Sequence, residues 1–235
     1  MKRFYKAAGI APQEDGGFGI LLDGRPVRTP ARALLALPNV ALGEAVAAEW
    51  AGQGEEIDPA SMPFTGFANA ALDQIAPDPA RFAESISVYG ESDLLCYRAD
   101  GPAELVRRQE EQWQPLLDWA ASHYDIRFAV TQGVLHVAQP PETLDRLREV
   151  VAAQPPFLLA PLSPLVGIAG SLVIGLAVLE GAFDLPRLWQ AAELDELWQA
   201  EQWGDDDEAL ARRSRRHRDF MQAADFSVLV RHKPA

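Results

Sequence analysis

Residues 16–28 read GGFGILLDGRPVR, and this stretch decides which fold the N-terminal part of the chain can adopt. The pair Asp23-Gly24 separates two runs rich in apolar residues, and Asp-Gly in that position is a strong signal for a β-hairpin. A further short strand is expected at residues 3–7. Residues 1 to about 40 are therefore predicted to form short antiparallel strands joined by turns.

Helical patterns follow this β-rich segment. Apolar residues recur at the spacing of one helix face within 42–53, 64–75 and 79–89. Glycines end the first and third of these segments, as expected for helix C-termini. The three patterns predict three helices that follow the strands directly.

The second half of the chain is mainly helical in pattern. Pro115 interrupts a long helical stripe and predicts a kink, and a small β-hairpin is expected near 126–138. The fold class predicted from these patterns is α+β. An N-terminal domain of short antiparallel strands and helices, residues 1–90, is expected to precede a multihelical C-terminal domain, residues 91–235.

A long uncharged run lies between Val150 and Leu179. Four prolines break its first half, so only Leu165–Leu179 can form a continuous helix. This segment is shorter than the roughly 20 residues that a bilayer-spanning helix requires. It is predicted to be a buried core helix without membrane insertion, and its small residues at 167, 171 and 175 are expected to let a neighbouring backbone approach closely.

Composition limits the possible partners and the compartment. The chain of 235 residues has 34 acidic and 21 basic side chains, a net charge of -13, which disfavours binding to nucleic acid or anionic lipid. Its single cysteine, Cys96, excludes an internal disulfide and suits a reducing compartment such as the cytoplasm. Cys96 stands in an apolar stretch and is expected to be a buried structural residue.

The sequence lacks the common catalytic signatures. It contains no phosphate loop, no dinucleotide-binding glycine motif, no zinc-protease helix motif and no nucleophile elbow. The four histidines are too scattered to form a local metal site. We therefore expect no catalytic residue, no metal, no cofactor and no nucleotide.

Two charged runs follow residue 204. The acids of 205–208 precede a helical segment and are interpreted as its N-terminal cap, because acids in a first turn complement the helix dipole. The Arg212–Arg218 cluster further along the helix obeys the same rule. Its alternative function, as the contact surface of a nucleic-acid adaptor, stays open and would require strongly salt-dependent binding.

Residues 185–203 form the most unusual pattern in the chain. As one helix they would place Glu196 within an apolar stripe and Leu197 and Trp198 on the opposite side. Glu196 is then either a core acid with a buried partner or an acid at the centre of a binding surface. General burial preferences favour the core-acid interpretation. The three tryptophans within fifteen residues partly offset this preference, because tryptophan is enriched among interface anchors. The alternative is a small carboxylate-based hydrolase, which requires a deep polar pocket.

Four separated motifs resemble the assembly chaperone family for the alpha subunit of F1-ATPase. They are GRPVRTP (24–30), AEWAGQGEEIDP (48–59), DLLCYR (93–98) and LDELWQAEQWG (194–204). The resemblance extends from about Arg3 to Gly204. It implies an ATP-independent, monomeric chaperone of the bacterial cytoplasm that binds the free alpha subunit, shields its apolar beta-facing surface and hands it over for assembly of the alpha/beta hexamer.

The resemblance also implies which positions are functionally sensitive, but it does not fix the role of each, and a purely structural role for Trp50 stays open. The positions carried over as functionally sensitive are Trp50, Asp195, Glu196 and Glu201, and Trp198 and Trp203 complete the candidate partner-binding set. Two positions depart from the family pattern. Gly66 stands where the family often has a basic residue, and Glu193 stands where it often has arginine.

Overall fold

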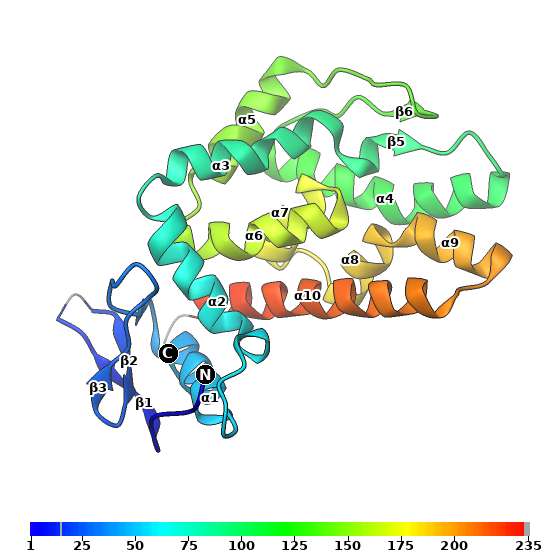
Figure 1. The fold of residues 1–235 in the computed structure, drawn as a ribbon. Coiled ribbons are helices and arrows are strands. Elements are labelled where there is room, and N and C mark those ends of the chain that lie inside the picture. The colour runs from blue at the N-terminus through cyan, green and yellow to red at the C-terminus, as the bar shows by residue number, and fades with distance from the viewer. Residues whose placement is uncertain (15, 233–235) are drawn as a thin grey trace. The chain divides into compact units, whose positions relative to one another are not determined.

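The computed structural model describes residues 1–14 and 16–232, and the chain divides into two compact units. Unit 1 contains Met1–Pro79, Pro155–Pro161 and the stretch that begins at Asp225. Unit 2 contains Ala80–Gln154 and Leu162–Ala224. The fold class is the predicted one: short antiparallel strands and helices come first, and many helices follow (Figure 1). The division at residue 90 stays a prediction.

The sheet of unit 1 is built around the predicted hairpin. Strand β2 (Phe18–Leu22) pairs antiparallel with β1 (Ala8–Pro12), with β3 (Arg25–Pro26) and, further along, with β4 (Ala36–Leu37). Asp23 and Gly24 form the turn with φ of 49° and 78°, the left-handed pair that a two-residue hairpin requires. The strand expected at residues 3–7 begins only at Ala8.

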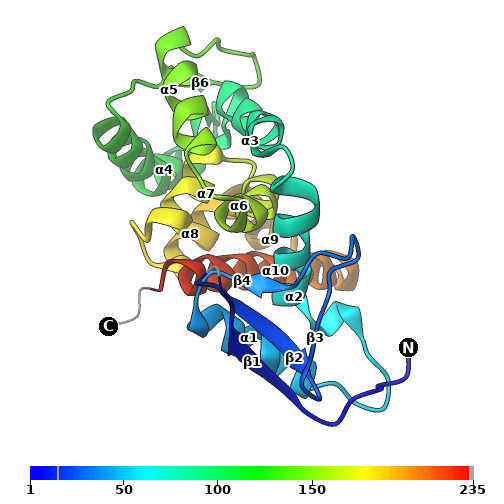
Figure 2. The same ribbon diagram turned by 90° about the vertical axis from the view of Figure 1, so that its left-hand side faces the viewer.

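Helical elements follow the strands, and the first of them packs on one face of the sheet. They are α1 (Val40–Ala51), a short 3-10 turn η1 (Pro59–Ser61), α2 (Pro63–Ala70) and a π-helical turn η2 (Ala71–Ile75). Figure 2 shows α1 packed behind β1 and β2. The core between them is apolar and includes Ile20, Leu37, Leu42, Val46 and Phe226.

Asn39 connects α1 to the C-terminal segment of the same unit. Its side-chain oxygen accepts a hydrogen bond from Leu42 N at 2.9 Å, which caps α1. Its amide nitrogen donates to the carbonyl oxygens of Leu229 and Val230, both at 2.9 Å. One side chain therefore satisfies unpaired backbone groups at two helix ends.

The later elements are mainly helices. They are α3 (Pro79–Ser87), the 3-10 turns η3 (Val88–Ser92) and η4 (Leu94–Cys96), α4 (Ala103–Tyr124), α5 (Pro141–Ala152), α6 (Pro156–Ala169), α7 (Leu172–Glu180), α8 (Leu185–Ala192), α9 (Leu194–Trp203) and α10 (Asp207–Arg231). Every residue of α7 from Leu172 to Leu179 is buried, so α7 forms the centre of unit 2. In the described part of the chain, no helix is long and apolar enough to cross a membrane.

The predicted continuous helix over Leu165–Leu179 is wrong. The chain breaks at Gly170, whose φ is 64°, and Ser171 caps the new helix by accepting a hydrogen bond from Ile174 N at 3.1 Å. The small residues therefore do not share one helix face. Gly175 nevertheless allows a close approach, since a Cβ there would lie 2.5 Å from Val166 of α6.

A buried carboxylate, Asp93, fixes this break. It is fully buried, and its two oxygens accept hydrogen bonds from Leu95 N and Val173 N, each at 3.0 Å. Burial raises the pKa of Asp93 to about 6, although these hydrogen bonds oppose the shift. Asp93 therefore joins η4 to the first turn of α7. Sequence reasoning assigned it no role.

The hairpin predicted near 126–138 is also wrong. Strand β6 (Thr131–Gln132) pairs parallel with β5 (Tyr97–Arg98) instead of with residues 134–138. The side chain of Gln139 makes the two backbone hydrogen bonds that a partner strand would otherwise make. It donates to Ala129 O and accepts from Ala129 N, both at 2.9 Å. A side-chain amide can supply the two hydrogen bonds of a strand pair, and the periodicity of apolar residues gives no sign of it.

Candidate partner-binding surface

The segment predicted to carry the site is two helices, not one. Helix α8 ends at Ala192 and α9 begins at Leu194, with Glu193 at the junction. The single apolar stripe expected over 185–203 is therefore wrong. Helix α8 buries Leu188 and Ala191, and the residues of α9 lie on a second, separate helix.

Glu193 is the buried acid of this region. Its side chain is only 1% exposed, and it lies 2.7 Å from Nη2 of Arg216 and 3.9 Å from Nε of Arg213. Burial raises the pKa of Glu193, and the arginine charges oppose that shift. The departure from the family pattern at this position is thus an acid with cationic partners on α10.

These contacts also account for part of the arginine cluster. Arg213 forms two hydrogen bonds to the Asp205 carboxylate, at 2.7 and 2.9 Å, and Arg216 donates to Ile168 O at 2.8 Å. Asp206 accepts from Ala209 N at 2.7 Å and so caps α10, as the sequence predicts. The other three arginines, at 212, 215 and 218, are exposed.

Glu196 is exposed on α9, so its interpretation as a core acid is wrong. Glu201 and Trp203 are exposed on the same helix, and Trp203 is 79% accessible. Asp195 and Trp198 are half-buried. The structure therefore brings five of the six candidate residues together on α9, as the spacing of the motif requires.

Arg108 of α4 holds two of the α9 residues. It donates to both Glu201 oxygens, at 2.8 and 3.0 Å, and its Cζ lies 4.8 Å from the centre of the Trp198 ring. The pair with Glu201 is solvent-exposed and screened by water, so it contributes little to stability directly. The main effect of Arg108 is to orient Trp198 and Glu201 on the surface.

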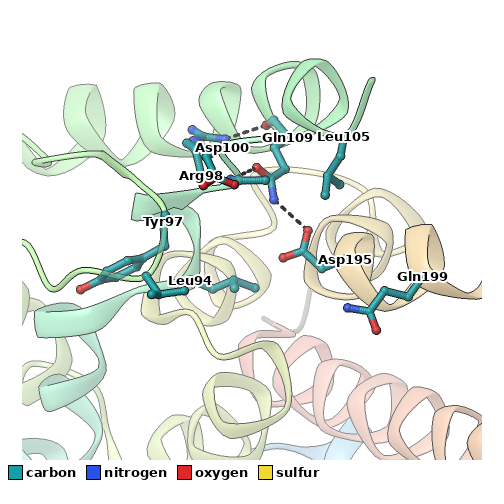
Figure 3. Close-up of a pocket in the computed structure, with 11 residues that line it drawn as sticks. Leu94, Tyr97, Arg98, Asp100, Leu105, Gln109, Asp195 and Gln199 are labelled. Atoms are coloured by element: carbon teal, nitrogen blue, oxygen red, sulfur yellow. Dashed lines mark hydrogen bonds between the residues drawn. The ribbon is translucent and has the colours of Figure 1, made fainter. Parts of the chain in front are cut away.

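Asp195 faces a cavity of about 470 Å³ between α4, β5 and α9 (Figure 3). Gln109 Nε2 donates to Asp195 Oδ1 at 2.8 Å, and Gln109 Oε1 accepts from Ala99 N at 2.7 Å. Figure 3 shows Gln199, one turn further along α9, beside the same cavity. Burial raises the pKa of Asp195, which the Gln109 hydrogen bond opposes.

Arg98 is a buried cation beneath this cavity. It is 5% exposed, donates to Gln109 O at 2.7 Å and to Gln114 Oε1 at 3.2 Å, and lies over the Trp113 ring. Among the described residues it forms no ion pair within 4.0 Å, and its Nε has no hydrogen-bond partner. Burial lowers the pKa of the Arg98 guanidinium. Sequence reasoning quoted Arg98 within a motif and assigned it no role.

An exposed apolar loop borders the cavity. Val134 is 96% accessible and Leu135 is 78% accessible, and Val134 also lines the cavity. These residues were expected in a hairpin strand. Exposed large aliphatic side chains at the rim of a cavity are typical of a surface that binds another protein.

The chemistry that this surface offers is limited. The cavity lining contains two acids, the half-buried Asp195 and the exposed Asp100, and lacks serine, cysteine, threonine and histidine. Within residues 1–14 and 16–232, no three His, Cys, Asp or Glu side chains gather in a way that could hold a metal ion. The arrangement of exposed tryptophan, exposed acids and an apolar rim is suited to protein recognition.

Trp50, the sixth candidate residue, belongs to unit 1. Its ring packs edge-on against Tyr5 with centroids 5.8 Å apart, and Tyr5 Oη donates to Trp50 O at 2.6 Å. The ring is half-buried and contributes to both apolar clusters of the unit, and its buried Nε1 has no hydrogen-bond partner among the residues that the structure describes. Trp50 therefore has a clear packing role, separate from the α9 residues.

The residues around Trp50 hold the following loop. Glu49 accepts hydrogen bonds from the backbone nitrogens of Phe64 and Thr65, both at 2.7 Å, and so caps α2. Gln53 accepts from Asp58 N at 2.7 Å and donates to Ser61 Oγ at 3.0 Å. The Glu-Trp-x-x-Gln motif thus orders residues 53–65.

Comparison with known proteins agrees with these features. The model of the ATP12 chaperone protein family matches residues 2–121. The crystal structure of Atp12 from Paracoccus denitrificans has a TM-score of 0.93 and 44% identity, with 98% of each chain covered. The structure of a mutant of that protein, with lysine in place of one aspartate, has a TM-score of 0.93 and 43% identity. The crystal structure of a protein from Agrobacterium tumefaciens has a TM-score of 0.91 and 42% identity. The match covers 97% of this chain and 85% of the Agrobacterium chain.

Proposed function

Because this chain belongs to the ATP12 chaperone protein family, an assembly chaperone family, we propose that its client is the free alpha subunit of F1-ATPase. The protein binds the apolar surface that the beta subunit later covers, keeps the alpha subunit from aggregating and releases it for hexamer assembly. It acts as a cytoplasmic monomer, without ATP, catalysis or a cofactor.

The observation that best supports this function is the surface of α9. Trp203 is 79% accessible and Trp198 is half-buried, with the exposed acids Glu196 and Glu201 on the same helix. A largely exposed tryptophan such as Trp203 costs free energy in a monomer, and covering it on binding recovers that cost. The neighbouring acids restrict binding to partners with basic or polar rims.

Reversible binding follows from physical competition. An interface of about 1,200–2,000 Å² with a few aromatic anchors can bind without any nucleotide-driven step. The alpha subunit leaves when the beta subunit covers the same apolar surface with a larger contact area. Release is therefore set by the concentration and affinity of the beta subunit.

Two observations disfavour the alternative functions. A hydrolase built on Glu196 lacks its pocket, because Glu196 is exposed and does not line the cavity beside Asp195. A nucleic-acid adaptor built on the arginine cluster loses two cations, because Arg213 and Arg216 are paired with acids. Neither alternative explains the exposed apolar rim.

The test uses an aggregation-prone F1 alpha subunit diluted into buffer without nucleotide. Equimolar protein should suppress light scattering and co-elute with the alpha subunit on a sizing column. Trp203→Ala and Glu196→Lys should each weaken suppression several-fold, since both change the exposed side of α9. Absence of both suppression and co-elution would exclude the proposed client.

Matched controls separate the α9 surface from general effects. Leu210→Ala removes another exposed apolar side chain, and Glu44→Lys makes the same charge change at an exposed position of α1. Both controls should suppress aggregation as the parent does. Equal losses in controls and α9 variants would mean that α9 is not the contact surface.

A further inference from the structure

A second cavity, of about 730 Å³, lies wholly within unit 1. Its apolar lining includes Tyr5, Leu22, Val27 and Trp50. It is larger than the cavity beside Asp195, and none of the α9 candidates lines it. A cavity of this size accommodates one or two large side chains.

Two of the four family motifs meet at this cavity. Residues Arg25–Arg28 of the first motif and Trp50 of the second contribute to its lining. The hairpin turn at Asp23-Gly24 brings the first motif back along β2, and α1 supplies Trp50. Sequence segments more than twenty residues apart therefore form one site.

The lining of the cavity carries more positive than negative charge, since it contains Arg25, Arg28 and one acid, Asp23, whose charge interacts with that of Arg25. Arg25 and Arg28 are exposed, and among the described residues neither forms an ion pair within 4.0 Å. Within the described part of the chain, the Arg28 side chain donates a hydrogen bond to Arg32 O, at 2.8 Å, and to no other group. In a protein of net charge -13, two unpaired arginines at one cavity mark a local reversal of sign.

The acid of this cavity is already engaged. Asp23 accepts hydrogen bonds from Lys6 N at 3.1 Å and from Ala7 N at 2.9 Å. Those backbone hydrogen bonds lower the pKa of Asp23. Its carboxylate therefore fixes the segment before β1 to the β2–β3 turn. Among the described residues it forms no ion pair within 4.0 Å with either arginine, so both guanidinium groups remain available to an external anion.

The rim of the cavity is apolar and accessible. Met1 is 74% and Phe4 is 67% accessible, and Phe4 packs edge-on against Tyr5 with ring centroids 5.3 Å apart. Exposed Phe4 next to buried Tyr5 extends the apolar lining outward to solvent. An occupant that covers this rim would bury aromatic surface at little conformational cost.

We propose that this cavity binds a peptide segment of the client in which a large apolar side chain stands beside a carboxylate. The apolar side chain enters between Tyr5, Val27 and Trp50. The carboxylate pairs with Arg25 and Arg28 at the mouth, where arginine forks recognise carboxylates well. This inference rests on the proposed function and adds a second contact region with the opposite charge to that of α9.

Binding of the full-length alpha subunit to charge variants tests the proposal. Arg25→Glu and Arg28→Glu should each weaken binding at least tenfold and reduce its salt dependence, because a steered charge pair becomes repulsive. Val27→Trp, which fills the cavity, should have a similar effect at all salt concentrations. Arg127→Glu makes the same charge change at an exposed site of unit 2 and should bind as the parent does.

Cross-linking identifies the occupant directly. A benzoylphenylalanine placed at the accessible position of Phe4 should cross-link to an alpha-subunit peptide that contains an acid next to a large apolar residue. Parent-like binding by Arg25→Glu, Arg28→Glu and Val27→Trp would overturn the inference and leave the proposed function intact. Failure of the parent itself to bind the alpha subunit would overturn both.

Discussion

Arg216 Nη2 lies 2.7 Å from Glu193 Oε1 and thereby connects α10 to the junction between α8 and α9. The Glu193 side chain is 1% exposed, whereas that of Arg216 is 35% exposed. Removing the half-buried guanidinium would leave the buried carboxylate without its close partner, which costs free energy. The position of α9, and with it that of Trp198 and the exposed Trp203, thus depends on an arginine some twenty residues further along the chain.

Removal of the Arg216 charge should destabilise the protein. Arg216→Met keeps most of the aliphatic stem and leaves Glu193 buried with only Arg213 at 3.9 Å. We expect the free energy of unfolding to fall by about 2–3 kcal/mol in urea titrations. The double variant with Glu193→Gln should recover part of this loss, because no buried charge remains.

Arg215→Met is the matched control. Arg215 is exposed on the same helix, so its replacement should change stability by no more than about 0.5 kcal/mol. Equal stability of the Arg215 and Arg216 variants would show that the ion pair contributes nothing measurable.

The buried Asp93 predicts a pH dependence of stability. Its pKa of about 6 lies above the unfolded value, so the folded state binds more protons between pH 4 and pH 6. The stabilising contribution of protonated Asp93 is therefore complete below about pH 4 and is lost as the pH rises through 6. The unfolding free energy of the parent minus that of Asp93→Asn should therefore fall by about 3 kcal/mol as the pH rises from 4 to above 6.

Urea titrations of both proteins at pH 4, 5, 6 and 7 measure this difference. All other titrating groups are common to the two proteins, so the comparison isolates Asp93. Parallel stability curves would contradict a raised pKa for this carboxyl group.

Local signals were sufficient for the elements that depend on neighbouring residues. The turn at Asp23-Gly24, the cap at Asp206 and the burial of α7 follow from turn chemistry, dipole complementarity and an uncharged run. These features involve residues a few positions apart. They therefore leave a pattern in the sequence itself.

Features that depend on distant residues could not be read in this way. The breaks at Gly170 and Glu193 are fixed by Asp93 and Arg216, which lie far away in sequence. Periodicity extends a helix across such positions, because nothing local contradicts it. The same error placed Glu196 in an apolar stripe, although the buried acid is Glu193.

The cap that Glu49 provides to α2 should be measurable. Met62, at the N-cap position, makes no side-chain capping bond, and Glu49 supplies both hydrogen bonds instead. Glu49→Ala should lower the unfolding free energy by about 1–3 kcal/mol. It should also speed hydrogen exchange at Phe64 N and Thr65 N. Glu44→Ala on the exposed side of α1 should leave exchange at these amides unchanged, and unchanged exchange in Glu49→Ala would refute the cap.

Alanine substitutions at Gly167 and Gly175 should change the stability of the protein in opposite directions. A Cβ at Gly175 would lie 2.5 Å from Val166 Cγ2 and 3.0 Å from Leu162 Cδ1, so α6 and α7 must separate locally. Overpacking of this kind costs about 1–3 kcal/mol. A Cβ at Gly167 meets only Tyr89 Oη, at 3.9 Å, and alanine there gains up to about 1 kcal/mol of helix propensity.

Thermal unfolding of both variants separates these two effects. Gly175→Ala should unfold at a lower temperature than the parent and Gly167→Ala at the same or a higher temperature. An added methyl group lowers the stability of the protein where a helical glycine permits close packing, and raises it where the glycine lies at an open position. Stabilisation by Gly175→Ala would mean that α6 and α7 are not in close contact at this point.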